Sequence, residues 1–200
     1  MKAPTRLYLA FFMQFIVAIS LVGIVLYMQV KQEHDSLVIN LAGRQRMLSQ
    51  KITKEILLLS EGHLSSEKVA NSINVFHDTL NSLYHGGKAP LDLEQTKFAE
   101  LPKPESKEVV DQLQKVESTW KLFRENALKV VEEKEQPSLE HIKKINVTLL
   151  EEMNRAVFLM DAEAARKVQS VRTLLLGGCV ALLVLFLITL RIILRDWKAD

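Results

Sequence analysis

The stretch VVDQLQKVESTWKLFRENALKV, residues 109–130, indicates how the chain folds. Its apolar residues recur at alternating steps of four and three, and they are Val109, Leu113, Val116, Trp120, Phe123, Ala127 and Val130. In an α-helix this spacing places them on one face, as in helices that pack in bundles. A β-strand would need apolar residues at every second position, and the stretch does not sustain that pattern. We therefore predict a bundle helix over residues 105–134.

Two other segments carry the same spacing. One set is Val69, Ile73, Phe76, Leu80 and Leu83, and the other is Ile142, Ile145, Leu149, Met153, Ala156 and Met160. They predict helices over residues 66–85 and 139–172. A further helix over about residues 32–60 has no breaker before it. Uncharged apolar stretches of membrane-spanning length flank this region, at residues 7–28 and 173–190, so both of its ends should return to the same membrane face. We therefore expect an antiparallel four-helix bundle with up-down-up-down topology.

Glycine, serine and proline mark the expected breaks between these helices. Gly62 lies in a serine-rich turn, with Ser65 and Ser66 as candidate N-caps. Gly86-Gly87 should end the second helix, and we expect one long loop from there to Pro104. Pro137-Ser138 predicts a tight third turn, with Ser138 as the N-cap of the last helix.

Two uncharged apolar stretches flank the predicted bundle. Leu7–Met28 has 22 residues and Thr173–Leu190 has 18 residues without an Asp, Glu, Lys or Arg. At a rise of about 1.5 Å per residue, either can cross a hydrocarbon core of roughly 30 Å. The first stretch is longer than a signal-peptide core and lacks a clear A-x-A cleavage site, which favours an uncleaved anchor. We therefore predict a chain that crosses a lipid bilayer twice.

The charges of the chain indicate its orientation and exclude some functions. Lys2 and Arg6 precede the first stretch, and Arg191, Arg195 and Lys198 follow the second, so both termini should be cytoplasmic. The whole chain has 26 Lys and Arg against 24 Asp and Glu, which argues against a nucleic-acid partner. One cysteine allows neither a disulfide within the chain nor a CxxC metal site.

No constellation in the sequence predicts catalysis, a cofactor or a bound metal. No two of the five histidines lie at i,i+4 on one helix. No grouping of serine, histidine and acid is present, and no phosphate-binding loop. We therefore expect that the chain is not an enzyme. Only ten residues, Arg191–Asp200, follow the second stretch, so we expect it to act through a separate signalling protein.

The segment NLAGRQRMLSQ, residues 40–50, differs from the rest of its helix. A helical wheel separates two faces. The predicted core face holds Leu41, Leu48, Ile52 and Leu59, and a second, nearly opposite face holds Ile39, Gly43, Arg46, Gln50 and Leu57. A glycine in mid-helix costs about 0.5–1 kcal/mol relative to alanine, so its presence on this second face suggests close backbone approach.

Two interpretations of this second face remain open from the residues alone. If two bundles pack through it about a two-fold axis, the two Arg46 side chains converge, and a small planar oxyanion between them would satisfy both guanidinium groups. Alternatively, Arg44 and Arg46 are ordinary exposed arginines of a solvated helix.

The run NLAGRQRMLSQ resembles the signature helix of the PilJ/NarX-type sensor domain, found in nitrate/nitrite sensor kinases and type IV pilus chemotaxis transducers. The likeness extends to Val116, Trp120 and Phe123, and to the segment Met153–Val157. It implies a protein of the bacterial inner membrane whose periplasmic four-helix bundle forms a homodimer. It also implies that nitrate or nitrite binds at the dimer interface through Arg46, with Gly43, Asn40 and Gln50 as the other site residues.

Together these observations predict an all-α membrane-anchored sensory module. We expect five segments: a cytoplasmic N-terminus (1–6), a transmembrane helix (7–30), the periplasmic bundle (31–172), a second transmembrane helix (173–194) and a short cytoplasmic tail (195–200). The competing hypothesis is a structural membrane bundle that scaffolds partners through helix contacts and binds no small molecule.

Overall fold

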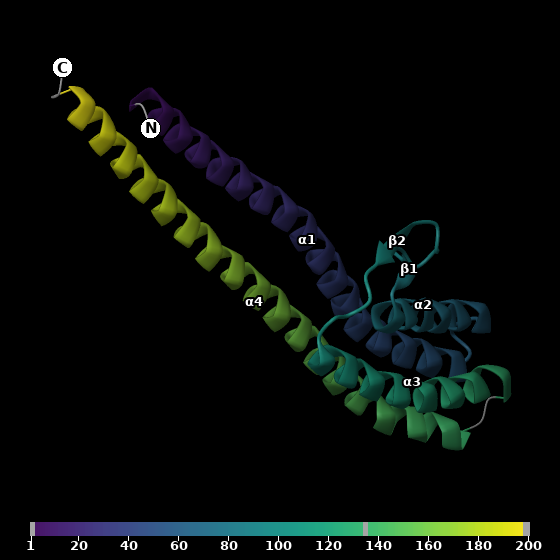
Figure 1. Ribbon diagram of the computed structural model, residues 1–200. Coiled ribbons are helices and arrows are strands. Elements are labelled where there is room, and N and C mark those ends of the chain that lie inside the picture. Colours follow the sequence, from purple (N-terminus) through teal and green to yellow (C-terminus); the bar gives the residue numbers. More distant parts are fainter. Residues whose placement is uncertain (1–2, 134–135, 198–200) are drawn as a thin grey trace. The chain divides into compact units, whose positions relative to one another are not determined.

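The computed structural model describes residues 3–133 and 136–197, which form four helices and one two-stranded hairpin (Figure 1). The helices are α1 (Ala3–Ser60), α2 (Ser66–His85), α3 (Lys107–Glu133) and α4 (Gln136–Trp197). The strands are β1 (Gly87–Pro90) and β2 (Phe98–Leu101). Apart from the hairpin, the regular structure is helical, as the sequence predicts.

These elements belong to two compact units. One unit is His34–Glu163, and the other combines the residues before it with those after it. Helices α1 and α4 each run without interruption from one unit into the other. The α-helical hydrogen-bond pattern is therefore continuous in both helices, as expected from a sequence without breakers at either junction.

The unit His34–Glu163 has a core made by the apolar stripes of all four helices. The predicted stripe of α3 is buried throughout, and Trp120 packs on Phe76 of α2 with ring centroids 4.0 Å apart. On α1, Leu41, Leu48 and Ile52 are buried. Ile145 and Leu59 lie at the edge of the core and are only partly buried. The 3-4 spacing thus predicted the core because only one face of each helix is shielded from water.

Buried glutamines add polar contacts between helices. Gln45 of α1 is completely buried, and its Nε2 donates a hydrogen bond of 2.8 Å to the carbonyl oxygen of Phe76 on α2. Gln112 of α3 donates one of 3.0 Å to the carbonyl oxygen of Glu152 on α4. These bonds tie α1 to α2 and α3 to α4 at fixed positions along their length.

The expected long loop after α2 contains a hairpin, so this part of the sequence-based prediction is wrong. Strands β1 and β2 pair antiparallel, with Lys88 opposite Glu100. Gly86 has a φ of 79° and ends α2 as expected, with its N–H bonded to the carbonyl oxygen of Ser82 at 2.9 Å. The strand sequences GKAP and FAEL are too short to show a period of two, which is why the pattern did not reveal them.

Helix boundaries otherwise follow the predicted breakers, with two differences. Ser65 occupies the N-cap position of α2 but makes no capping hydrogen bond with its side chain. Helix α4 begins at Gln136, so the predicted turn is wrong: Pro137 and Ser138 lie within the first turn of the helix, and Ser138 is not its N-cap. Proline is tolerated in the first turn of a helix, where backbone N–H groups have no partner within the helix.

The second unit consists of the apolar ends of α1 and α4. Both helices are long and apolar enough to cross a membrane by length and composition, and most of their large apolar side chains are exposed. Within this unit, Gln14 Nε2 donates a hydrogen bond of 2.9 Å to Thr189 Oγ1. A Cβ atom on Gly178 would lie 2.3 Å from Leu21 Cδ2, so this glycine permits close contact between α4 and α1.

Candidate functional site

Arg46 lies on α1 at the seam with α4 in the unit His34–Glu163. Its Nη1 donates a hydrogen bond of 3.2 Å to Asn154 Oδ1 of α4. Within residues 3–133 and 136–197, no carboxylate forms an ion pair with this guanidinium. The side chain is only partly buried. Asn154 therefore positions the Arg46 guanidinium without neutralising it, and the other N–H groups of Arg46 are chemically suited to an oxyanion.

Gln50, one turn further along α1, forms a reciprocal amide pair with Asn146 of α4. Gln50 Nε2 donates to Asn146 Oδ1 at 2.9 Å, and Asn146 Nδ2 donates to Gln50 Oε1 at 3.2 Å. Asn146 and Asn154 are eight residues apart, about two helical turns, and both contact α1. The seam beside Arg46 is therefore lined by neutral amides.

Gly43 lies under the Arg46 side chain, three residues earlier on α1. A Cβ atom at this position would meet Arg46 Nη2 at 3.6 Å, which is an ordinary van der Waals distance. The packing described within this chain therefore does not require a glycine there. Asn40 is exposed one turn earlier, and no hydrogen bond described in the structure joins it to Gly43, Arg46 or Gln50.

Arg44 has a different environment, because its guanidinium holds the hairpin against the bundle. Its Nη1 donates a 2.6 Å hydrogen bond to the carbonyl oxygen of Leu91, and its Nη2 bonds the carbonyl oxygen of Pro90 and, at 3.3 Å, Thr79 Oγ1. Burial lowers the pKa of Arg44, and the nearby Asp92 carboxylate opposes this shift. Arg44 thus contributes to structure, on the side of α1 that faces α2.

Exposed apolar side chains surround the Arg46 seam. Met47 of α1 is 55% exposed, and Val147 and Phe158 of α4 are 56% and 60% exposed. Val147 lies seven residues before Asn154 and Phe158 four residues after it, so both share a face of α4 with Asn154. We call Met47, Val147 and Phe158 the apolar rim of the site. Large apolar side chains gathered beside a charged group are typical of an interaction surface.

The sequence alone did not identify the α4 side of this site. Asn146 and Asn154 lie beside the core stripe of α4, and no property of one helix tells which residue of another it will face. The available signals were their spacing of eight positions and the place of Asn154 in the segment Met153–Val157, which resembles the sensor family. No group of three or more potential metal-ligating side chains occurs in the described parts of the chain.

Comparison with known proteins finds relatives among chemotaxis transducers. The family model for the N-terminal region of type IV pili methyl-accepting chemotaxis transducers, PilJ, matches residues 27–144. The methyl-accepting chemotaxis protein McpN of Pseudomonas aeruginosa is 32% identical over 148 residues, or 74% of this chain. The match spans only 26% of the length of that protein.

A solved structure resembles the helical unit. The ligand-binding domain of the P. aeruginosa nitrate receptor McpN superposes with a TM-score of 0.52 at 30% sequence identity. The superposition covers 64% of this chain and 95% of that domain. Because the family model matches more than half of the chain, the chain belongs to the PilJ family of chemotaxis-transducer N-terminal domains.

Proposed function

We propose that the chain is a membrane-anchored sensory module that binds nitrate or nitrite between two copies of its helical unit. The central unit would lie in the periplasm and the apolar ends of α1 and α4 in the bacterial inner membrane. The relative whose ligand-binding domain resembles this unit is a nitrate receptor, which supports the proposed class of ligand. The proposed site residues are Arg46, Gly43, Asn40 and Gln50.

The observation that carries this proposal is the state of Arg46. Its guanidinium is positioned by Asn154, a neutral acceptor, and no described carboxylate neutralises its charge. A guanidinium presents N–H donors in one plane, and nitrate presents three oxygens in one plane. A single exposed arginine holds such an anion weakly in water. Two arginines that approach across a dimer interface would bind it from both sides in a drier environment.

The apolar rim and Gly43 supply the surface for that approach. The rim residues are exposed in one copy, and their burial against a second copy would favour association. Gly43 is not required by the packing within one chain, so a bare backbone there is explained if the partner helix comes close. The two Arg46 groups would repel one another in the empty dimer. Bound anion would remove this repulsion and favour the closed interface.

A signal could leave the site along α1 and α4, which are continuous from the helical unit to the apolar unit. Anion binding shifts the equilibrium between two dimer arrangements only by its differential affinity for them. A tenfold preference corresponds to about 1.4 kcal/mol. The resulting movement of the two helices would be passed to a signalling partner in the membrane or cytoplasm.

Calorimetry on the full chain in lipid nanodiscs tests the proposal. Titration with sodium nitrate should release or absorb heat that saturates at about one anion per two chains. Sodium chloride at the same concentration is the matched control for ionic strength. If nitrate, nitrite and related oxyanions all give no binding heat, the sensor hypothesis fails and a scaffolding bundle without a small ligand is favoured.

A further inference from the structure

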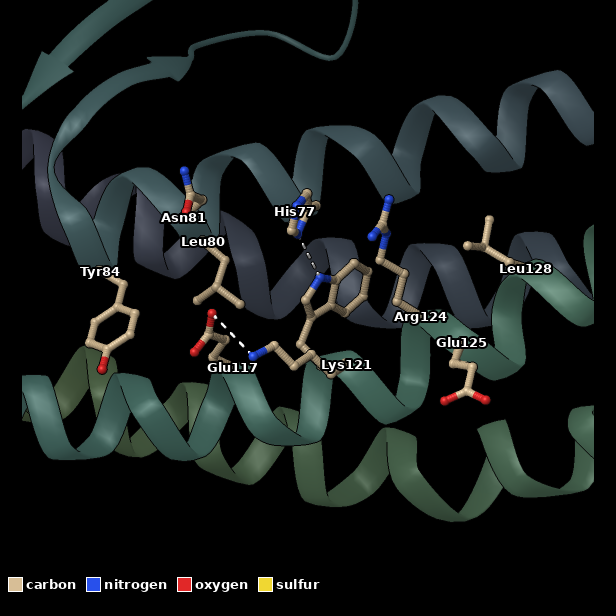
Figure 2. A pocket seen from close by; sticks show the side chains of 10 residues that line it. His77, Leu80, Asn81, Tyr84, Glu117, Lys121, Arg124, Glu125 and Leu128 are labelled. Atoms are coloured by element: carbon tan, nitrogen blue, oxygen red, sulfur yellow. Dashed lines mark hydrogen bonds and ion pairs between the residues drawn. The ribbon is translucent and has the colours of Figure 1, made fainter.

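A groove lies in the helical unit, between α2 and α3 (Figure 2). It has a volume of about 300 Å³, which is at the small end of ligand-binding cavities, about 300–1,000 Å³. Arg46 contacts α4 from α1, whereas this groove is formed by the other two helices of the bundle. The groove is therefore separate from the Arg46 site.

The floor of the groove is apolar, and its indole N–H group already has a hydrogen-bond acceptor. Trp120 and Leu80 are only 1% and 2% exposed, and Leu128 and Tyr84 extend the apolar lining to either side. The Trp120 Nε1–H, the polar atom of the indole, donates to His77 Nδ1 at 3.4 Å. Because Trp120 and Leu80 are nearly covered, the apolar surface that a ligand can reach belongs mainly to the partly buried Tyr84 and Leu128, which suits a ring or a branched hydrocarbon.

Arg124 is the charged group in the groove without a partner. Its Nε atom is buried, and no acceptor among the described residues bonds to it. The side chain extends from α3 toward α2, whereas Glu125 points away from α2 (Figure 2). The residue as a whole is only partly buried, so an anion that enters the groove can form charge-assisted hydrogen bonds with the terminal N–H groups of the guanidinium.

The acidic side chains of the groove do not cancel this charge. Glu117 is paired with Lys121 one turn away, with Nζ and Oε1 at 3.7 Å. Glu125 is paired with Lys129 at 3.2 Å, outside the groove lining. With both carboxylates engaged by lysines, the guanidinium of Arg124 remains to attract a negative group. The groove thus combines one uncompensated cation with an apolar floor.

We propose that this groove binds a small organic monocarboxylate, with its carboxylate on Arg124 and its apolar body against the accessible apolar lining beside it, which includes Leu128 one turn along α3. A ligand of one ring or a short branched chain fits the volume. Inorganic oxyanions lack the apolar body that the floor would contact, so they should bind here weakly. The site is independent of the anion site proposed at Arg46, and the two can be tested in the same chain.

Benzoate is the probe for this proposal. The full chain in nanodiscs is titrated with sodium benzoate by calorimetry and by tryptophan fluorescence. The chain has two tryptophans, so the fluorescence uses a Trp197→Phe background in which Trp120 is the reporter. We expect saturable binding of about one benzoate per chain with a change in Trp120 emission. Benzamide has the same ring without the charge and should bind at least about tenfold more weakly.

Matched variants separate the groove from the rest of the chain. Arg124→Gln should weaken benzoate binding at least about tenfold, whereas Lys115→Gln, an exposed cation on the same helix, should leave it unchanged. Leu128→Trp should also weaken binding by filling the groove. This variant is measured by calorimetry alone, because its new tryptophan would add to the Trp120 emission, and circular dichroism checks that each variant is folded. Arg46→Ala should leave benzoate binding intact. Equal binding of benzamide, no effect of Arg124→Gln, or no saturable benzoate binding overturns the proposal.

Discussion

Arg46 of α1 and Asn154 of α4 meet across the seam between their helices, with Nη1 and Oδ1 3.2 Å apart. The amide oxygen accepts from the guanidinium and orients it, and it carries no charge that would neutralise the arginine. An aspartate at position 154 would bond equally well but would compete with any incoming anion. A neutral partner therefore leaves the charge of Arg46 available for the proposed anion.

Replacement of Arg46 by alanine should abolish nitrate binding while the bundle remains folded. The side chain lies outside the core and makes one described hydrogen bond between helices, so we expect a loss of unfolding free energy below about 1 kcal/mol. Calorimetry measures the binding, and thermal unfolding followed by circular dichroism measures the stability. Nitrate affinity equal to that of the unmodified chain would show that the anion binds elsewhere.

Asn154→Asp should reduce nitrate affinity by at least about tenfold, because the new carboxylate forms an ion pair with Arg46 in place of the anion. Asn146→Asp is the control. It introduces the same charge on the same helix, but next to the neutral Gln50 rather than next to Arg46. Calorimetric titration of both variants compares them directly. If both lose the same affinity, a general field effect rather than the Arg46 contact would explain the result.

Arg44→Ala should have the opposite effect to Arg46→Ala. The substitution removes three hydrogen bonds that connect α1 to α2 and to the residues around the end of β1. We expect a loss of about 2–3 kcal/mol of unfolding free energy, with nitrate affinity retained in the folded fraction. Urea unfolding monitored by circular dichroism gives the stability. A stable Arg44→Ala chain that no longer binds nitrate would move the site to the other side of α1.

The loop between β1 and β2 should become less ordered at acid pH. The side-chain hydrogen bond from Thr96 is the main cause that lowers the pKa of Asp92, and the backbone N–H of Thr96 also donates to it, at 2.7 Å. Because the folded pKa lies below the unfolded value of about 3.9, these bonds stabilise the loop above that pH and are lost as pH falls through the folded value. Carbon-13 NMR titration of the Asp92 carboxyl group measures its pKa in the folded chain.

Thr96→Val provides the control for that titration. The variant removes the hydroxyl donor and keeps a branched side chain of similar size, so the pKa of Asp92 should move up toward its usual value. An unchanged Asp92 titration in Thr96→Val would assign the shift to another neighbour, such as Lys97.

The helices were predictable from the sequence because each has one apolar stripe, and burial of that stripe is what holds the bundle together. The stripe of α3 was identified in full, from Val109 to Val130, and all of it is buried. The hairpin was missed because each strand has four residues, and β1 ends at Pro90. Side-chain hydrogen bonds from Arg44 and Ser82 connect it to the bundle, and local sequence patterns do not encode such contacts.

The site was only half predictable for the same physical reason. The wheel separated Arg46 from Arg44, and the structure places them on opposite sides of α1, facing α4 and α2. The wheel could not identify Asn154 as the partner of Arg46, because the pairing of two helices depends on how their apolar stripes pack together. Gln45, between the two arginines, would have been assigned to solvent by its polarity, yet it is completely buried and bonded to the Phe76 carbonyl.

The final prediction concerns the route of the signal along α1 and α4. Both helices are continuous, so a shift between them at the Arg46–Asn154 seam should reach the residues where they enter the apolar unit. Cysteines introduced at Val30 and Arg172, in a Cys179→Ser background, would report that shift as a change in disulfide formation rate. We expect saturating nitrate to change the rate, and Arg46→Ala to remove the change.

Sodium chloride should leave the rate unaltered, because it does not offer the planar set of oxygens that two guanidinium groups can share. A crosslinking rate that is equal with and without nitrate, in a chain shown by calorimetry to bind it, would mean that the anion is held without moving these helices. The chain would then act as a nitrate-binding module whose signal does not pass through α1 and α4.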